Sequence, residues 1–247
     1  MSTAVDMDWP ATARFALYYA PPRESVWWRA GCDWLGRDAE SGVSCATPQP
    51  DGLQRPLADL TQAPRRYGWH GTLVAPFRLA DGVTQHDVLA VACRWAQTCS
   101  SFALPVEAAR LGDFVALRPA TSTADEQMRD LAATALHALA ALRAAPTPAD
   151  LARRLETPLT ERQRTLLIEW GYPYVFDEFR FHMTLSNSLD LADERDALLA
   201  WWRARVPFLG PLPVDGAALF VEPAPGEPFV LWQRLTFSHG FSHTPDR

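Results

Sequence analysis

Two histidines each begin the same twelve-residue phrase, which occurs twice in the chain. The first copy, HGTLVAPFRLAD, runs from His70 to Asp81, and the second, HMTLSNSLDLAD, runs from His182 to Asp193. Six of the twelve positions are identical without a gap, and the copies begin 112 residues apart, far more than the period of a solenoid repeat. The spacing predicts two copies of a whole lobe, each of which contributes one His-x-Thr.

The second copy separates polar from apolar side chains at alternate positions. Because successive side chains of a strand point to opposite faces, Arg180, His182, Thr184 and Ser186 fall on one face, and the apolar residues between them fall on the other. A half-buried strand has this pattern. Here the polar face carries groups that can do chemistry.

In the first copy His70, Thr72 and Val74 share the corresponding face. Imidazole titrates near neutral pH, so one histidine can accept a proton while its twin donates one. A threonine hydroxyl two residues further on can hydrogen-bond a phosphoryl oxygen. We therefore predict a phosphodiester held between His70 and His182, with Thr72 and Thr184 as phosphate ligands. No third ligand has a spacing that favours a metal, so no metal or cofactor is expected.

Several arginines are candidates for the same anion site. Arg180 lies on the polar face of the second copy and can add charge-assisted bonds. Arg65 and Arg66 precede the first copy, and Arg78 falls within it. Two alternatives remain for these three arginines. They line the anion site, with Arg66 as a phosphate ligand, or they lie on the solvated surface.

Aromatic residues near the two copies can stack against a base or a sugar. Tyr172 and Tyr174 belong to a Gly-Tyr-Pro-Tyr segment just before the second copy and are the preferred candidates for a binding pocket, and Tyr18 is a further one. Tyr67 and Trp69 fall on the apolar face of the first strand, so we expect them in the core.

The composition restricts the classes of partner. The 247 residues carry a net charge of −6, so no global field attracts a large nucleic acid, and the expected partner is a small phosphorylated molecule. All 23 basic residues are arginine, which excludes a Schiff-base lysine. No apolar run approaches the ~18 residues that span a bilayer, and we expect no membrane association. The N-terminus does not resemble a secretory signal and the four cysteines form no CxxC, so we expect a cytoplasmic protein. The sequence leaves the oligomeric state open.

Each copy begins a run of strand, helix, strand and strand. The first run is predicted at 67–74, 84–99, 102–109 and 113–118, and the second at 179–186, 192–205, 212–220 and 229–237. A strand at 14–20 and a helix at 24–35 precede them, followed by an irregular Pro- and Gly-rich connection over 38–64.

A helical insert is predicted between the two runs, over 123–171. Its helices begin at a capping box over 123–126, at Pro148 and at Thr160, and the last one ends at Gly171. The fold class is α+β, with two antiparallel sheets that line a central cleft and helices outside. We predict one bilobal domain over 14–237, with lobe one at 67–118, lobe two at 179–237, and tails at 1–13 and 238–247.

Longer segments resemble a known family. The stretches RFALYYAPP (14–22), WLGRD (34–38), RYGWHGTLVAPFRLA (66–80) and LTERQRTLLIEWGYPYVFDEFRFHMTLSNSL (159–189) resemble the 2H phosphoesterase superfamily. They are most similar to a branch whose members are commonly encoded in phosphonate-utilisation operons. The resemblance implies a pseudo-twofold bilobal fold and metal-independent hydrolysis of a cyclic phosphodiester, such as a nucleotide or ribosyl cyclic phosphate. It implies His70 and His182 as the acid–base pair, and Thr72 and Thr184 as phosphate ligands.

The chain departs from that branch inside both motifs. Val74 replaces a lysine on the expected cleft face, Gly71 replaces an alanine, and the second motif continues with Ser186 and Asn187 in place of Thr-Gly. Loss of a cation from the cleft favours an altered substrate. Two alternatives therefore stand beside the phosphodiesterase: acid–base chemistry on a different small molecule, and a ligand-binding protein without catalysis.

Overall fold

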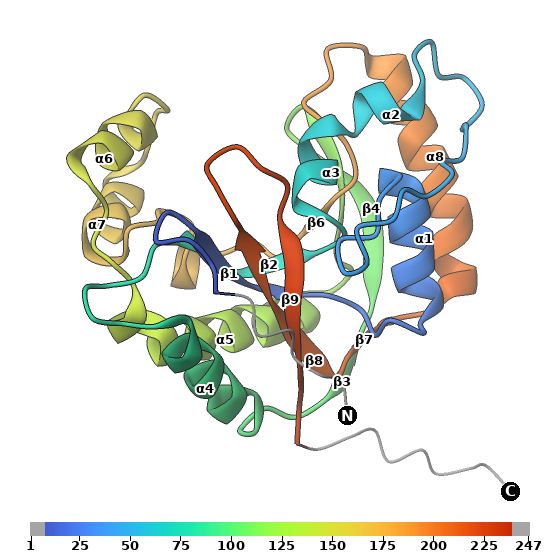
Figure 1. The fold of residues 1–247 in the computed structure, drawn as a ribbon. Coiled ribbons are helices and arrows are strands. Elements are labelled where there is room, and N and C mark those ends of the chain that lie inside the picture. Colours follow the sequence, from blue (N-terminus) through green and yellow to red (C-terminus); the bar gives the residue numbers. More distant parts are fainter. Residues whose placement is uncertain (1–7, 239–247) are drawn as a thin grey trace, which may run out of the picture.

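A computed structural model describes residues 8–238, which form antiparallel sheets covered by helices (Figure 1). The largest sheet has four strands in the order β2-β1-β8-β9. These strands are β1 (Arg14–Tyr19), β2 (Gly71–Phe77), β8 (Gly216–Glu222) and β9 (Val230–Thr236). The two inner strands, β1 and β8, are buried along almost their whole length, as their apolar sequences predict.

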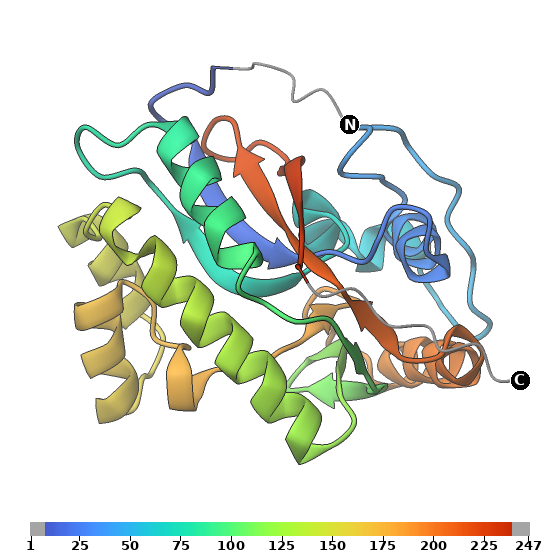
Figure 2. The ribbon, with the colours of Figure 1, turned by 90° about the horizontal axis from the view of Figure 1, so that it is seen from below.

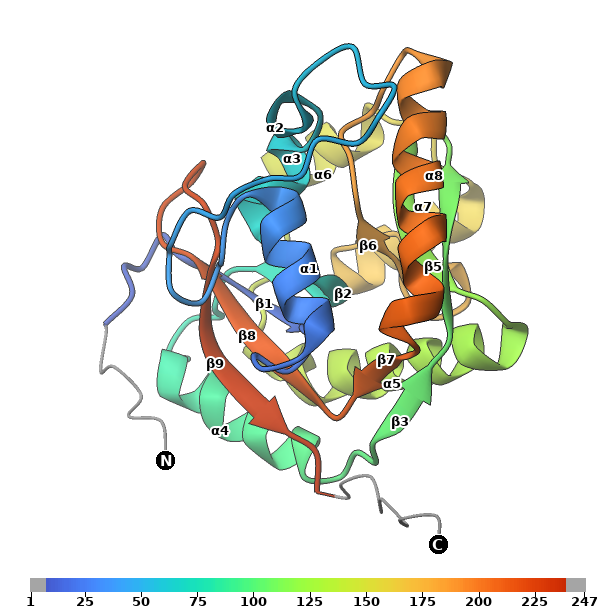
Figure 3. The same ribbon diagram turned by 90° about the vertical axis from the view of Figure 1, so that its right-hand side faces the viewer.

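Two smaller sheets complete the β-structure. The three-stranded sheet contains β4 (Val106–Leu111), β5 (Phe114–Pro119) and β6 (Met183–Thr184) in that order. The two-stranded sheet pairs β3 (Phe102–Leu104) with β7 (Leu212–Val214). Because β3 leads directly into β4 and β7 leads directly into β8, this short pair connects the two larger sheets (Figure 3).

The two sequence repeats exchange strands between the sheets. The first motif strand, β2, shares its sheet with β8 and β9, which belong to the second repeat. The second motif strand, β6, pairs with β5 of the first repeat, with Thr184 opposite Ala116. The expectation that 67–118 and 179–237 each form their own lobe is therefore wrong. The strands that follow each motif helix cross over to the sheet of the other motif.

Helices cover the outer faces of the sheets. Along one face of the four-stranded sheet lie α4 (Gln85–Ala96) and α5 (Ser122–Leu139), as Figures 1 and 2 show. The three-stranded sheet is covered by α8 (Ala192–Leu209), which contacts α1 (Val26–Leu35) through tryptophan rings. Two short helices, α2 (Leu57–Leu60) and α3 (Gln62–Tyr67), precede the first motif.

The segment between β5 and β6 contains α5, two further helices and two 3-10 turns. The helices α6 (Pro148–Leu155) and α7 (Glu161–Trp170) both begin at a threonine with a complete capping box, Thr147 and Thr160. The 3-10 turns are η1 (Ala140–Leu142) and η2 (Phe176–Glu178). The starts predicted at Pro148 and Thr160, and the end at Gly171, are confirmed. The capping box expected at 123–126 is wrong, because the hydroxyl of Thr121 caps α5.

Both motif strands are shorter than predicted. Residues 62–67 form α3, so the first motif strand begins at Gly71 and His70 lies just before it. The second motif strand begins only after the 3-10 turn η2 and spans two residues. Beyond it Ser186 is buried, and its hydroxyl accepts from the Val115 N–H at 3.0 Å. The expectation that Ser186 shares the exposed polar face is therefore wrong.

A cluster of tryptophans fills the space between α1, α8 and the first motif. The ring of Trp202 on α8 stacks on Trp69 at 5.6 Å and on Trp27 at 6.3 Å, with Trp34 at 5.3 Å. All four side chains are buried. The residue directly before His70 is thus fixed in the core, as expected for Trp69.

All four cysteines are free thiols. No helix within residues 8–238 combines the length and the apolar character needed to cross a membrane.

Candidate active site

His70 lies at the turn between α3 and β2. Gly68 has φ = +83°, and a Cβ there would lie 2.4 Å from the Cβ of Ala39, so this turn requires glycine. The Nδ1 atom of His70 lies 2.9 Å from the Gly68 carbonyl oxygen. On one face the His70 ring stacks on Tyr18 at 4.0 Å between centroids. Buried Trp69 and the Tyr18 ring together hold the imidazole in one orientation.

His182 has the same local arrangement in the second motif. Its Nδ1 atom lies 2.9 Å from the carbonyl oxygen of Arg180, again two residues earlier. The neighbours Phe181 and Met183 are buried, so the polar side chain between them points away from the core, as the alternation predicts.

These two contacts determine the tautomer of both rings. A backbone carbonyl only accepts hydrogen bonds, so each Nδ1 carries the proton and each Nε2 is unprotonated. The Thr72 hydroxyl lies 3.5 Å from Nε2 of His70. In both motifs the reactive nitrogen is therefore available for proton transfer.

Two cavities meet at the motif residues. The His182 cavity has mainly apolar walls and a volume of about 1040 Å³, part of it open to solvent; it is lined by Thr72, Val74, Leu136, Tyr172, Tyr174, Phe179, Arg180 and His182, among others. The His70 cavity is lined by Tyr18, Tyr67, His70, Thr72, Arg154, Tyr172 and Thr184, among others. Because Thr72, Ala75 and Tyr172 line both, the two cavities adjoin each other. Together they are called the cleft, and residues of both His-x-Thr motifs line it.

Burial keeps both histidines neutral in the free protein. It lowers the pKa of His70 from 6.5 to about 4, against the opposing hydrogen bond to Gly68, and His182 lowers it further. Burial also lowers the pKa of His182. Burial likewise raises the pKa of the Tyr172 hydroxyl, which stays protonated and can donate a hydrogen bond.

Most of the other predicted side chains line the cleft. Tyr172, Tyr174 and Arg180 contribute to the His182 cavity, and Val74 also lines it, on the predicted face. Tyr67 is half-buried, packs against the core and stacks on buried Phe229, and it also lines the His70 cavity, so the expected core position is confirmed in part.

Arg66 is not brought to the cleft. Its guanidinium pairs with the buried carboxylate of Glu222, which also binds Arg14. Arg78 pairs with Asp150 at 2.9 Å, and Arg65 donates to the carbonyl oxygen of Gly36 at 3.4 Å. The phosphate-binding role predicted for Arg66 is therefore not supported by its position.

The cleft contains two cations that the sequence patterns did not indicate, Arg143 in the His182 cavity and Arg154 in the His70 cavity. Arg154, on α6, lines the His70 cavity, and its guanidinium lies 4.7 Å from the centroid of the Tyr172 ring. Nothing in the sequence distinguishes it from the other arginines of the insert, because only the packing of α6 places it there. Among residues 8–238 no group of three His, Cys, Asp or Glu side chains is arranged to hold a metal ion. Two further histidines, His239 and His243, lie outside the described residues.

The two motifs pack closely against each other at Gly71. A Cβ at this position would lie 2.4 Å from the ring atoms Cε2 and Cζ of Phe181, which directly precedes His182. We expect Gly71→Ala to displace Phe181 and His182, and to lower any turnover in the cleft by about 10²-fold, as a 1 Å misplacement can. Steady-state kinetics measure this effect. The double variant Gly71→Ala/Phe181→Leu removes the clash and should recover part of the loss, whereas wild-type turnover in the single variant contradicts the prediction.

Comparison with known proteins identifies the family. Residues 72–230 match the family model described as "Protein of unknown function (DUF1045)". The chain therefore belongs to the DUF1045 family.

Two curated relatives bear the name "Ribose 1,5-bisphosphate phosphokinase PhnN". The protein from Laribacter hongkongensis is 43% identical over 221 residues, and the one from Janthinobacterium sp. is 38% identical over 233 residues. The matches cover 88% and 91% of this chain but 50% and 51% of the relatives, so the chain spans about half their length. A solved structure titled "Crystal structure of phosphoesterase" aligns over 92% of this chain and 99% of its own, with 13% identity and a TM-score of 0.38, which is too low to support fold or function.

Proposed function

We propose that this protein is a metal-independent phosphoesterase of the 2H type, which hydrolyses a small cyclic phosphodiester by acid–base catalysis between His70 and His182. The observation that carries the proposal is the matched geometry of the two histidines. Each Nδ1 donates to the carbonyl two residues earlier, and each ring lines one of two adjoining cavities. Thr72 lines both cavities and Thr184 lines the His70 cavity, which supports a role for their hydroxyl groups as donors to the phosphate.

In the proposed reaction, the neutral Nε2 of one histidine takes a proton from water while the water oxygen forms a bond to phosphorus. The bond from phosphorus to one ribose oxygen breaks, and the protonated second histidine gives its Nε2 proton to that oxygen. The products are a phosphomonoester and a free hydroxyl. We assign His70 as the base, because its pKa of about 4 keeps it neutral, and His182 as the acid. Hydrogen bonds from Thr72 and Thr184 stabilise charge on the non-bridging oxygens.

The apolar lining of the cleft supports a substrate whose phosphate is attached to a small organic group. Apolar side chains and the rings of Tyr172 and Tyr174 form much of the His182 cavity, and Val74 lines it where the family resemblance implies a lysine. Such walls fit the face of a sugar or a base. The same apolar lining is the observation that favours a second candidate, acid–base chemistry on a small molecule other than a cyclic phosphodiester.

The phosphokinase name of the relatives is not proposed for this chain. Phosphate-binding loops of the G-x-x-x-x-G-K-[ST] type need a lysine, and the chain has none. We propose that the named activity belongs to the part of the relatives that this chain does not match. The phosphoesterase proposed here would then act on a related sugar phosphate of phosphonate metabolism.

A hydrolysis screen in EDTA tests the proposal. We expect phosphomonoester products from nucleoside 2′,3′-cyclic phosphates or ribose cyclic phosphates, with rates unchanged by the chelator. Absence of turnover on all of them would overturn the phosphodiesterase. Tight binding without turnover would favour a ligand-binding protein.

The lowered histidine pKa values predict an acidic activity profile. The active form carries one proton on the pair, and both pKa values lie below the usual 6.5, so this form is lost as the pH rises. We therefore expect kcat/KM to fall by up to about tenfold per unit between pH 7 and pH 8. A kinetic pH series with one cyclic substrate measures it. A flat or rising profile in that range would contradict the assignment.

A further inference from the structure

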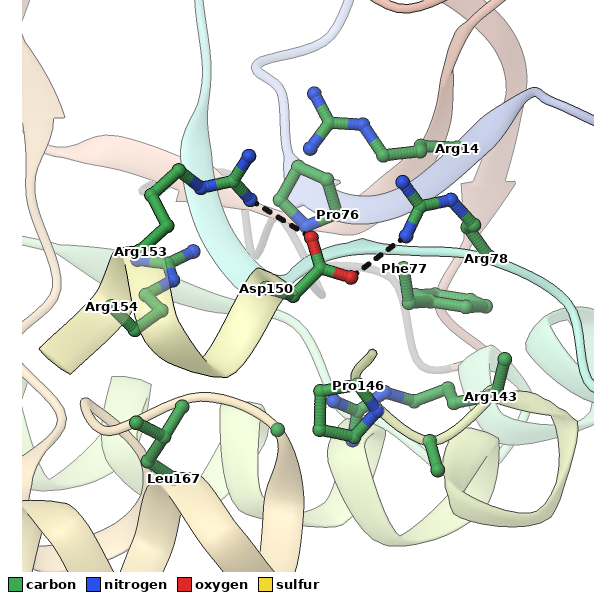
Figure 4. A pocket seen from close by; sticks show the side chains of 13 residues that line it. Arg14, Pro76, Phe77, Arg78, Arg143, Pro146, Asp150, Arg153, Arg154 and Leu167 are labelled. Carbon is green, nitrogen blue, oxygen red and sulfur yellow. Dashed lines mark hydrogen bonds and ion pairs between the residues drawn. The ribbon is translucent and has the colours of Figure 1, made fainter. Parts of the chain in front are cut away.

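An arginine-rich cavity adjoins the cleft on the side of the helical insert (Figure 4). Its charged lining residues are Arg14, Arg78, Arg143, Arg153, Arg154 and Asp150. They come from β1, the end of β2, the segment after α5, and α6. Five guanidinium groups thus line a small cavity around one carboxylate, and part of this cavity is open to solvent.

Some of these charges are already neutralised. Asp150 accepts hydrogen bonds from Thr147 and from the guanidinium groups of Arg78 and Arg153. The Thr147 hydroxyl and Arg78 lower the pKa of Asp150 to about 2, so its negative charge persists and is shared between Arg78 and Arg153. Arg14 pairs with Glu222.

Arg143 and Arg154 have no carboxylate partner among the ion pairs of residues 8–238. Arg143 donates from Nη2 to the carbonyl oxygen of Trp170 at 2.6 Å, while its Nε is buried without a hydrogen-bond partner. Burial of a guanidinium without a counter-charge is costly. A bound anion would remove that cost.

The arginine cavity adjoins the proposed active site and shares lining residues with both of its cavities. Pro76 and Arg154 line both this cavity and the His70 cavity, and Arg143 lines both this cavity and the His182 cavity. An anion in the arginine cavity can therefore belong to the same molecule as a phosphodiester in the cleft.

We propose that the arginine cavity binds a phosphomonoester on the substrate, separate from the cyclic phosphodiester that reacts at His70 and His182. The inference rests on the proposed function and narrows its substrate class. A phosphomonoester carries close to two negative charges at neutral pH, which matches the two guanidinium groups without a carboxylate. Guanidinium groups bind phosphate oxygens in bidentate geometry. The protein would thus bind a terminal phosphate of the substrate in the cavity next to the reacting centre.

The test compares adenosine 2′,3′-cyclic phosphate with the same compound carrying a 5′-phosphate. We expect wild-type kcat/KM to be about 10- to 100-fold higher for the 5′-phosphorylated compound, the gain expected from charge-assisted hydrogen bonds. Arg143→Met and Arg154→Met should each move this ratio toward 1. Arg164→Met, which removes an exposed arginine of α7, is the matched control and should preserve the ratio.

A wild-type ratio near 1 overturns the inference and leaves the proposed function intact. A high wild-type ratio that both Arg143→Met and Arg154→Met retain also overturns the inference. If neither adenosine compound is hydrolysed, the wider substrate screen decides the proposed function, and calorimetry with adenosine 5′-monophosphate decides the inference. Binding that weakens at least about tenfold in Arg143→Met or Arg154→Met supports the phosphate site, and absence of wild-type binding overturns it.

Discussion

Replacing His182 with glutamine is expected to lower kcat/KM for a cyclic phosphodiester by about 10²- to 10⁴-fold, and His70→Gln should do the same. Glutamine can still donate a hydrogen bond to the carbonyl oxygen two residues earlier, but it cannot take up or release a proton near neutral pH. Each variant should therefore keep the shape of the cleft and lose one half of the acid–base pair. Steady-state kinetics on the best substrate of the screen measure the loss.

The double variant sharpens this test. Because both histidines act in one step, the loss in His70→Gln/His182→Gln should stay close to that of the worse single variant and fall well short of the product of the two. His86→Gln is the matched control, since His86 is exposed on α4 and lines neither cavity. Wild-type kcat/KM in either single variant would refute the assignment of the pair. Thermal melts confirm that the variants remain folded.

Trp202→Ala is expected to lower the free energy of unfolding by about 3–5 kcal/mol. The ring contacts tryptophans from α1, from α8 itself and from the residue before His70, with Trp201 at 5.1 Å and Trp69 at 5.6 Å. Its removal leaves a cavity that the surrounding rings cannot fill without leaving their rotamers. Urea unfolding followed by circular dichroism measures the change.

Phe208→Ala on the same helix is the matched control. Phe208 is 90% exposed, so its loss should change the unfolding free energy by less than about 0.5 kcal/mol. A Trp202→Ala effect no larger than this control would show that the cluster does not stabilise the core. Trp202→Ala should also affect turnover. It removes the stacking partner of Trp69, so the neighbouring His70 should become more mobile and turnover should fall even where the protein stays folded.

The sequence predicted those parts of the site that depend on local pattern. Alternation along a strand correctly placed half-buried His182 and Thr184 on the face opposite the buried side chains of Phe181 and Met183. Helix starts at Pro148 and Thr160 followed from capping residues whose hydrogen bonds are local. Signals of this kind are contained within a few residues and need no knowledge of the fold.

Features that depend on distant contacts were not predictable in this way. The exchange of strands between the repeats depends on which strand edges pair, and the alternation of apolar residues within a strand does not specify its partner. Arg66 is next to the first motif in sequence, yet it pairs with Glu222, which is 156 residues further along. Arg154 is remote in sequence, yet it lines the His70 cavity because α6 folds back over the cleft. Proximity along the chain was a poor guide to the cations of the site.

The exchanged strands also bear on the order in which the protein can assemble during synthesis. The inner strand β1 pairs with β8, which a ribosome makes some 200 residues later. Until β8 and β9 emerge, β1 and β2 have one apolar strand edge without a partner, and such edges are prone to mispairing. A chain released before β8 therefore contains both histidines but cannot complete the sheet that holds His70. Such a truncated product should depend on chaperones or be degraded.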